Sequence, residues 1–455
     1  MKKNLFLLFL SMSSLLQAQY SINGTMTTTN ESDWVVLYKI EGARQIYIQN
    51  TNIIKDTILQ DGVKKVIANF KFILPEKAPK GFYRTTYALK NAGFIDFLFN
   101  KEDISFTFNP TSPEQSISFS KSNENKIYRD YLEAINISQQ KLDSIQMLAL
   151  RNPNDSVAST YKILLGNVND VQKIYLEKSK NMMISHFVKA TLRKNSSELI
   201  MSRENYLLNL LDVFFDNMDF SDKVLYNSSF LVDRITNYIF DLNYSQKVSL
   251  QQKYYKESIA KVMTKIPDLK FKKDVLEFLI TQFEALKNIE IIDFIFDEYY
   301  KKLPEKLQNN KFTTEVLDKL AVEIGRTSPD FSWKEGNRPY KLSTLKGSEN
   351  YVLVFWSTGC PHCLKEIPEL HRFMKDKTKI KVIAFGMENN DFYWKKYTSR
   401  LAGWHHVLGL GKWENKIART YQVFSTPTYL VLDANKKIIA KPDQIKDLTE
   451  FFTKK

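Results

Sequence analysis

Cysteine is almost absent from this 455-residue chain, which has only Cys360 and Cys363. Two cysteines cannot build a framework of structural disulfides, so any disulfide within the chain joins this pair. A structural zinc site needs four ligands, and neither a second cysteine pair nor a histidine pair at finger spacing is present. Haem attachment would need histidine directly after the second cysteine, where Leu364 stands. We therefore predict no metal and no cofactor.

Long hydrophobic runs are also scarce, and the prominent one lies at residues 5–16. It follows Lys2 and Lys3 and precedes the small Ala18, an order typical of an export signal. The run is shorter than the roughly 18 apolar residues that span a bilayer, which disfavours a membrane anchor. No cysteine near Ala18 supports a lipoprotein anchor, and no later segment is long enough to span. We predict a signal peptide over residues 1–18 and a periplasmic or exported chain that does not span the membrane once the signal is cleaved.

Glycine and proline are rare in the middle of the chain. Residues 120–324 contain one glycine, Gly166, and three prolines. A stretch so poor in helix breakers predicts an all-α domain, here 119–324. Its aromatic residues are interpreted as core and not as a cofactor site. Helical spacing is visible in two apolar sets, and three polar residues are candidate helix starts. These are Leu207, Leu208, Leu211, Phe214 and Phe215; Val275, Leu276, Leu279, Ile280 and Phe283; and Asp155, Ser221 and Asp268.

Period-two alternation of apolar residues precedes this region, over residues 19–118. Turn residues such as Asp61 and Gly62 separate the alternating segments. This pattern predicts an N-terminal antiparallel β domain, as a small sheet or a sandwich. The expected strands are residues 34–40, 66–73, 94–99 and 104–108.

From Gly325 onward glycines return, and strand and helix patterns alternate, so residues 325–455 are predicted to form a C-terminal α/β domain. The chain is thus expected to be multidomain. The expected strands are 352–356, 380–385, 428–432 and 437–440, and the expected helices are 361–374, 391–401, 413–421 and 444–451.

The net charge of +14 is concentrated in this C-terminal region. Residues 325–455 hold 23 Lys and Arg against 13 Asp and Glu. A positive face could stabilise a thiolate or attract acidic partners, and a solvated lysine-rich surface is the alternative. Nucleic acid is not an expected partner, because an exported chain without a basic-aromatic motif has no evident use for it.

The cysteine pair lies where a buried strand gives way to a helix. A cysteine attacks a disulfide only as the thiolate, and the N–H groups and dipole of a helix N-terminus favour that charge on Cys360. Pro361 suits the first helical turn, where its missing donor costs nothing. His362 can be cationic or donate a hydrogen bond, which would lower the thiol pKa further. Cys363, about one turn later, is close enough to attack a mixed disulfide.

Three further residues support redox chemistry. Glu366 follows Cys363 by three residues, so both project from one helix face. A partly buried carboxylate there would have a raised pKa and could exchange a proton with the second thiol. An exposed helix glutamate is the alternative. Thr426 and Pro427 precede a strand, and proline is tolerated at a strand start.

These features together resemble the exported TlpA/ResA-like thiol-disulfide oxidoreductases of the thioredoxin superfamily. The resemblance covers residues 325–455 and rests on five segments. It implies a thioredoxin fold, Cys360 as nucleophile, Cys363 as resolving thiol and Glu366 as the buried acid. The segments are Pro329-Asp330-Phe331, residues 342–347 (LSTLKG), residues 354–363 (VFWSTGCPHC), Lys365–Pro368 and Ser425–Thr428.

The resemblance also assigns the substrate-binding surface. Pro427 would be the cis-proline beside the dithiol, the backbone of Thr426 would pair with the substrate peptide, and Trp356 would contribute to the same surface. Residues 20–115 look like the β-rich domain of unknown function that precedes such modules in exported Bacteroidetes proteins, which assigns no activity.

Three positions depart from the family pattern. Gly359 replaces the usual tryptophan before the first cysteine, and Val354 stands where classical thioredoxins bury an aspartate. Pro361-His362 is the inter-cysteine pair of the oxidant DsbA, although the scaffold resembles reductive relatives. Potentials of such dithiols range from about −270 to about −120 mV, enough to reverse the direction of exchange.

We therefore expect a periplasmic oxidoreductase that exchanges disulfides with protein thiols, as a reductase or isomerase in preference to an oxidant. A membrane thiol reductase is a candidate for its unknown upstream partner. The alternative is an envelope binding or scaffold protein whose β and helical domains capture a partner, with the redox module secondary. Substrate and oligomeric state are not encoded in any motif.

Overall fold

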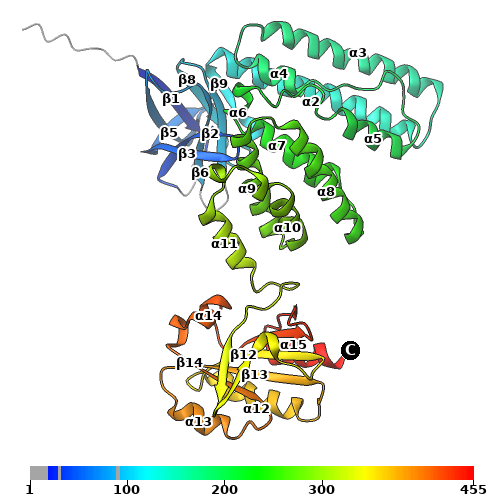
Figure 1. Cartoon of the computed structure of the whole chain (residues 1–455). Coiled ribbons are helices and arrows are strands. Elements are labelled where there is room, and N and C mark those ends of the chain that lie inside the picture. The colour runs from blue at the N-terminus through cyan, green and yellow to red at the C-terminus, as the bar shows by residue number, and fades with distance from the viewer. Residues whose placement is uncertain (1–18, 29–31, 89–92, 455) are drawn as a thin grey trace, which may run out of the picture. The chain divides into compact units, whose positions relative to one another are not determined.

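A computed structural model describes residues 19–28, 32–88 and 93–454 (Figure 1). The predicted signal peptide, residues 1–18, lies outside this part. The chain divides into two compact units: one comprises Met1–Gln282 and Glu290–Pro304, the other Phe283–Ile289 and Glu305–Lys455. Within the described ranges, every helix is too short or too polar to cross a bilayer. The boundaries predicted at 118/119 and 324/325 stay predictions.

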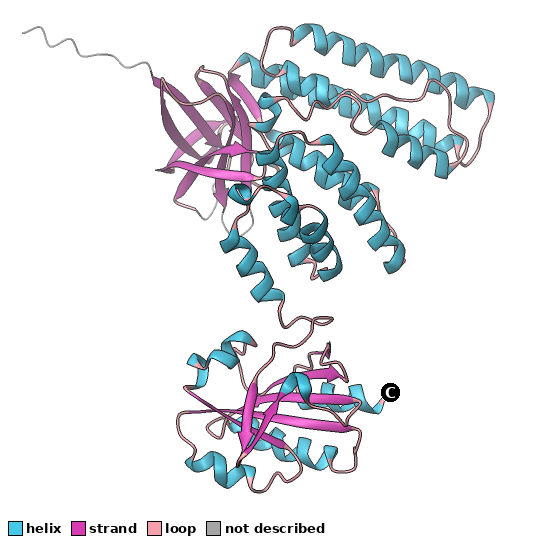
Figure 2. Ribbon diagram, in the orientation of Figure 1, coloured by secondary structure: helices cyan, strands magenta, loops and turns pink. Residues whose placement is uncertain are grey.

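The N-terminal residues form two sheets that share one apolar core (Figure 2). Their strand orders are β4-β5-β1-β8-β9 and β3-β2-β6-β7. All hydrogen-bonded pairs are antiparallel except β1 with β8, which are parallel. The predicted antiparallel β fold is confirmed, with this one parallel pair added. The strands are β1 Gln19–Met26, β2 Trp34–Glu41, β3 Arg44–Asn52, β4 Ile54–Gln60, β5 Val63–Pro75, β6 Gly81–Ala88, β7 Gly93–Phe99, β8 Ile104–Phe108 and β9 Ser118–Lys121.

Strand β1 illustrates why three of the five strands in its sheet escaped prediction. It is rich in polar residues, and its apolar side chains, such as Ile22 and Met26, are few but fully buried. Gly24 lies beneath the ring of Phe70, where an added Cβ would stand only 2.0 Å from a ring carbon. Packing against β5 therefore stabilises β1 as a strand, whereas the β propensity of its own residues does not.

The middle of the chain is helical, as predicted. The apolar set from Val275 to Phe283 is fully buried on α9, and Asp268 accepts a hydrogen bond from the Phe271 N–H (2.7 Å) at its start. The other two helix starts are Asn154 and Asp222, one residue from the predicted positions. The helices are α1 Pro113–Ser116, α2 Asn123–Ala149, α3 Asp155–Lys178, α4 Ser185–Thr191, α5 Arg203–Val213, α6 Lys223–Tyr226, α7 Phe230–Thr236, the π-helix η1 Asn237–Leu242, α8 Val248–Lys265, α9 Leu269–Ala285, α10 Ile289–Glu298 and α11 Asn310–Leu320.

The β sheets and the helices of the first unit are joined by buried polar contacts. Asn125 at the start of α2 accepts the N–H of Leu98 (2.9 Å) and donates to its carbonyl (2.7 Å). The side-chain amide of Asn125 thus makes the two backbone hydrogen bonds that a neighbouring strand would make with the edge strand β7. Glu124 accepts the N–H of Ile184 (2.9 Å), which ties α2 to the segment before α4.

The C-terminal residues form a five-stranded sheet of order β14-β13-β12-β15-β16. Strands β12, β13 and β14 are parallel, whereas β15 and β16 pair antiparallel. The α/β prediction is confirmed; strand β14 and the hairpin β10–β11 were not predicted. The elements are β10 Ser332–Glu335, β11 Arg338–Lys341, β12 Asn350–Trp356, α12 Pro361–Met374, β13 Ile380–Glu388, α13 Phe392–Thr398, β14 His405–Leu410, α14 Lys416–Thr420, β15 Thr428–Asp433, β16 Ile438–Ala440 and α15 Ile445–Thr453.

Helices cover both faces of this sheet because strand β12 is apolar on both sides. Val352, Val354 and Trp356 face a core that includes α12 and α15. Leu353 and Phe355 face a second core, which α14 and the β10–β11 hairpin complete. Strand β12 is thus a central strand, buried on both faces. The cysteine pair follows its carboxyl end, at the end of the sheet where the parallel strands β12, β13 and β14 all terminate.

Candidate active site

The cysteine pair lies at the carboxyl end of β12 and the first turn of α12, opposite the loop that leads into β15. Cys360 is the N-cap of α12, where its sulfur accepts the N–H of Cys363 (3.2 Å). Its thiol donates to the carbonyl of Thr426 (3.2 Å) from the facing loop. Cys360 is partly exposed and Cys363 is fully buried. One sulfur is thus available to a partner, and the other is covered.

The two thiols ionise differently. Partial burial opposes ionisation of Cys360. Hydrogen bonds from the Cys363 thiol, from the Thr426 side chain and from the N–H groups of Cys363 and His362 outweigh the burial, so the pKa of Cys360 is lowered. Burial, followed by the hydrogen bond to Cys360, raises the pKa of Cys363 to about 12. At neutral pH the first thiol therefore carries the nucleophilic thiolate more readily than the second.

The residues between the cysteines act through the backbone. Pro361 occupies the first helical position, where it sacrifices no hydrogen bond. The His362 side chain is exposed, and its imidazole has no hydrogen-bond partner among the described residues. Its backbone N–H is one of the groups that lower the Cys360 pKa. The hydrogen bond expected from the imidazole is thus not formed, and an effect of His362 as a cation stays a prediction.

Glu366 lies on α12 and contacts residues of β15 and α15. It is partly buried, and its Oε2 accepts hydrogen bonds from the Tyr429 hydroxyl (2.8 Å) and the Ile445 N–H (3.3 Å). The alternative of an exposed helix glutamate does not describe this side chain. Its role as a proton carrier stays a prediction.

Tyr429 is a site residue that sequence reasoning missed. It is 1% exposed, and burial, its hydrogen bond to Glu366 and the nearby Cys363 all raise its pKa. Its hydroxyl therefore stays protonated and donates to the carboxylate. The available signal was its place two residues after Pro427, which puts both on one side of the same extended segment.

The peptide bond between Thr426 and Pro427 is cis, as the resemblance implies. The carbonyl of Thr426 points at the Cys360 thiol, so the loop and the dithiol are in contact. Pairing of this backbone with a substrate peptide stays a prediction.

Trp356 does not belong to a substrate-binding surface, and that assignment is wrong. Its side chain is 1% exposed and packs in the core beneath α12, together with Val352 and Val354. Both faces of β12 are covered, so a side chain on either face of this strand is buried.

A second residue that the sequence did not reveal supports the loop before Cys360. Glu388, at the carboxyl end of β13, is 6% exposed. Its Oε1 accepts the N–H of Thr358 at 2.5 Å. The parallel pairing of β12 with β13 brings these two strand ends together.

Among the described residues, no cluster of three or more His, Cys, Asp or Glu side chains is able to hold a metal ion.

Comparison with known proteins agrees with this geometry. The model of the Redoxin family matches residues 323–447. The thiol-disulfide oxidoreductase ResA of Bacillus thuringiensis (strain Al Hakam) is 31% identical over 145 residues, which cover 30% of this chain and 81% of the relative. The thioredoxin-like protein YneN of Bacillus subtilis (strain 168) is 25% identical over 126 residues, covering 27% and 74%.

Solved structures were compared as well. The crystal structure of a domain of a possible thiol-disulfide isomerase from Cytophaga hutchinsonii ATCC 33406 aligns with 28% identity and a TM-score of 0.26. The alignment covers 29% of this chain and 92% of that domain.

Proposed function

This chain belongs, through its C-terminal part, to the ResA-like thiol-disulfide oxidoreductases of the thioredoxin superfamily, and on that premise we propose that Cys360 and Cys363 exchange disulfides with protein substrates in the periplasm, in the direction of reduction or isomerisation. The observation that carries this proposal is the asymmetry of the pair. A partly exposed thiol with a lowered pKa stands in front of a buried thiol with a raised one.

In the first step the Cys360 thiolate attacks one sulfur of a substrate disulfide. The substrate S–S bond breaks, a Cys360–substrate S–S bond forms, and the second substrate sulfur leaves as a thiolate that takes a proton. The N–H groups around Cys360 hold the attacking charge before the reaction. The Thr426 backbone beside this sulfur would orient the substrate peptide.

In the second step Cys363 loses its proton and attacks Cys360 Sγ. The mixed disulfide breaks, the Cys360–Cys363 disulfide forms, and the substrate leaves as a thiolate that is then protonated. Two electrons have passed from the dithiol to the substrate. Because the pKa of Cys363 is about 12, its proton needs an acceptor, and Glu366, held by Tyr429, is the one we assign.

A thiol donor must then reduce the Cys360–Cys363 disulfide to complete the cycle. We assign this step to an upstream thiol reductase, with a membrane protein as the candidate class. The direction of exchange depends on the reduction potential of the pair. We expect a potential in the glutaredoxin range, about −200 to −230 mV, or below.

Trapping of the mixed disulfide tests the proposal. The Cys363→Ser variant should accumulate a covalent complex with a disulfide-bonded protein such as insulin, visible on a non-reducing gel, and the Cys360→Ser variant should form none. Equilibration of the wild-type pair with glutathione buffers should give the potential above. Absence of any complex, or failure of the pair to cycle between dithiol and disulfide, would overturn the oxidoreductase mechanism. A potential near −120 mV would overturn only its direction.

A further inference from the structure

The first unit contains a cavity that the redox function does not use. It has a volume of about 1140 Å³ and is lined by residues of α1, α2, α4, α5, α7 and the π-helix η1. Ligand pockets commonly measure about 300–1,000 Å³, so a small organic molecule fits with room to spare. π-Helical turns occur frequently at functional sites, and η1 supplies Asn237, Asp241 and Leu242 to this wall.

Arg234 is the unusual residue of the cavity. Its Nε is buried and has no hydrogen-bond partner, and within the described part of the chain its guanidinium forms no ion pair. The guanidinium carbon lies 4.4 Å from the ring centroid of Phe214, so the ring covers one face of the plane. Burying a charged donor without a partner is costly, and such a group calls for an explanation.

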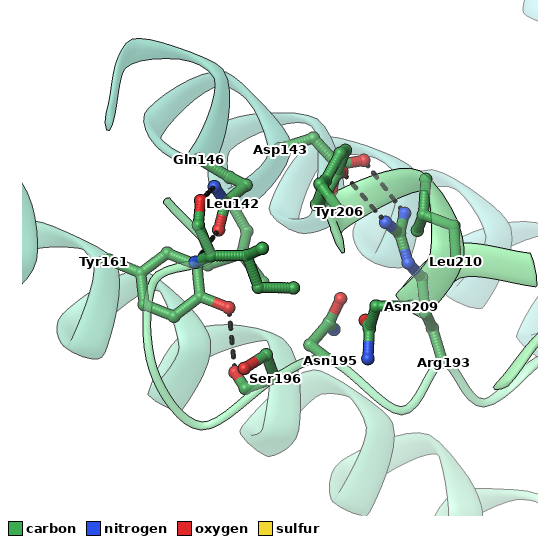
Figure 3. Close-up of a pocket in the computed structure, with 11 residues that line it drawn as sticks. Leu142, Asp143, Gln146, Tyr161, Arg193, Asn195, Ser196, Tyr206, Asn209 and Leu210 are labelled. Carbon is green, nitrogen blue, oxygen red and sulfur yellow. Dashed lines mark hydrogen bonds and ion pairs between the residues drawn. The ribbon is translucent and has the colours of Figure 1, made fainter. Parts of the chain in front are cut away.

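Arg193 lies at the same wall and is already fixed in place. It donates to Asp143 (2.9 Å) and to the hydroxyl of Tyr206 (3.3 Å), which in turn donates to Asp143 (3.2 Å) (Figure 3). Burial and then the charge of Arg193 lower the pKa of Arg234, which means that the two cations are near enough to repel. Asp143 forms its ion pair with Arg193, and no described carboxylate pairs with Arg234.

The rest of the wall is mixed. Leu210, Val213 and Phe214 supply apolar surface next to the arginines, and Arg129 adds a third cation. Glu114, Glu133 and Asp241 also line the cavity, yet none of these carboxylates pairs with Arg234. Asp143 neutralises Arg193, so Arg234 is the guanidinium at this end that no described carboxylate pairs with.

We propose that this cavity binds an amphiphilic organic anion, whose carboxylate or phosphate is held by Arg193 and Arg234 and whose apolar body contacts Leu210, Val213 and Phe214. Guanidinium groups bind planar oxyanions with paired hydrogen bonds, and a group already fixed by its neighbours loses little freedom on binding. The anion would supply a charged partner for the Arg234 guanidinium, which has none among the described residues.

Binding of 8-anilinonaphthalene-1-sulfonate to the full-length protein, followed by fluorescence, tests this site. Dodecanoate and dodecyl phosphate, kept below micellar concentrations, should displace the dye, and whichever competes better identifies the oxyanion. Dodecanol and dodecyltrimethylammonium should compete at least about tenfold less well, because neither offers a charged acceptor. Equal competition by dodecanol would overturn the proposal.

Variants locate the site. Arg234→Gln should weaken displacement by dodecanoate about tenfold, whereas Arg151→Gln, which changes an exposed arginine outside the cavity, should leave it unchanged. Leu210→Asp is a second test of the site. Its new carboxylate should repel the anion and should also weaken displacement by dodecanoate about tenfold. Circular dichroism and thermal melting establish that each variant is folded. Wild-type affinity in both folded cavity variants would overturn the assignment.

Discussion

The two thiols of the active site stand one helical turn apart, yet their surroundings give them different chemistry. We predict that iodoacetamide alkylates Cys360 of the reduced protein with a midpoint pH below that of a free thiol. Cys363 should stay unlabelled until the pH approaches about 12. Peptide mapping of the labelled protein across a pH series measures both midpoints. Equal labelling of the two sulfurs at pH 8 would contradict the asymmetry.

The raised pKa of Cys363 also predicts how stability depends on pH. A group whose pKa is higher in the folded state than in the unfolded state contributes stability below its unfolded pKa and loses it as pH rises. The stability that the protonated Cys363 thiol contributes should be lost between about pH 9 and about pH 12. Thermal melting of the reduced protein should therefore decline more steeply over this window than that of Cys363→Ala. Parallel declines would show that the thiol does not contribute.

The Glu366–Tyr429 pair is predicted to act on the second step only. Glu366→Gln should slow resolution of the mixed disulfide about a hundredfold, since general base catalysis contributes about 10²–10⁴. Tyr429→Phe, which removes one hydrogen bond to the carboxylate, should slow it about tenfold. Rapid-mixing kinetics separates the two steps, and formation of the mixed disulfide should be unchanged.

Glu369 supplies the matched control for this prediction. It is a carboxylate on the same helix, three residues further on, and it is exposed. Glu369→Gln should leave both steps unchanged. An equal effect of the two glutamine variants would point to the net charge of α12 and not to a positioned base.

At the level of elements, strand β13 supports the loop that precedes Cys360. Glu388→Ala removes the buried acceptor of the Thr358 N–H, and an unsatisfied buried donor costs about 1–3 kcal/mol. We expect that loss in urea denaturation, together with a smaller difference between the Cys360 and Cys363 alkylation midpoints as the loop loosens. Glu388→Gln keeps an acceptor oxygen and should restore most of both. Equal losses in the two variants would exclude the hydrogen bond as the cause.

Several elements around the site were predictable because their local signals agree with their tertiary role. Helix α12 begins and ends at the predicted residues, since Pro361 favours a first turn and its apolar residues repeat at helical spacing. Strand β12 was found as an apolar run buried on both faces. Trp356 is the last residue of this run, and burial on both faces places its side chain inside.

Other features had no local signal. Strand β14 contains two histidines and a glycine, and its pairing with β13 determines its conformation. Glu388 joins the site only because the parallel strands β12 and β13 end at the same edge of the sheet. Contacts of this kind depend on the sheet order, which periodicity does not encode.

Over the whole chain, composition indicated where helices replace strands, but it gave no sign of how the first two regions are connected. The amide of Asn125 pairs with both backbone groups of Leu98, and one asparagine among many attracts no attention in a sequence. Two arginines of the unassigned cavity, Arg234 and Arg193, come from α7 and from the segment between α4 and α5. Their approach is likewise a property of packing, so a binding site could not be predicted there.

The C-terminal core and the β-rich core are separate, so we predict that a destabilising substitution in one core lowers a thermal transition that a substitution in the other core does not. Phe355 is fully buried in the C-terminal core and Phe97 is 1% exposed in the β-rich core. Replacing a buried phenylalanine by alanine costs about 3–5 kcal/mol. Calorimetry of the full-length chain should show Phe355→Ala lowering the transition that also abolishes dithiol activity, and Phe97→Ala lowering a different one. The double variant should show both shifts, because residues that share no neighbours contribute additively. If both substitutions displaced one common transition by the same amount, the two cores would have to unfold as a single cooperative body.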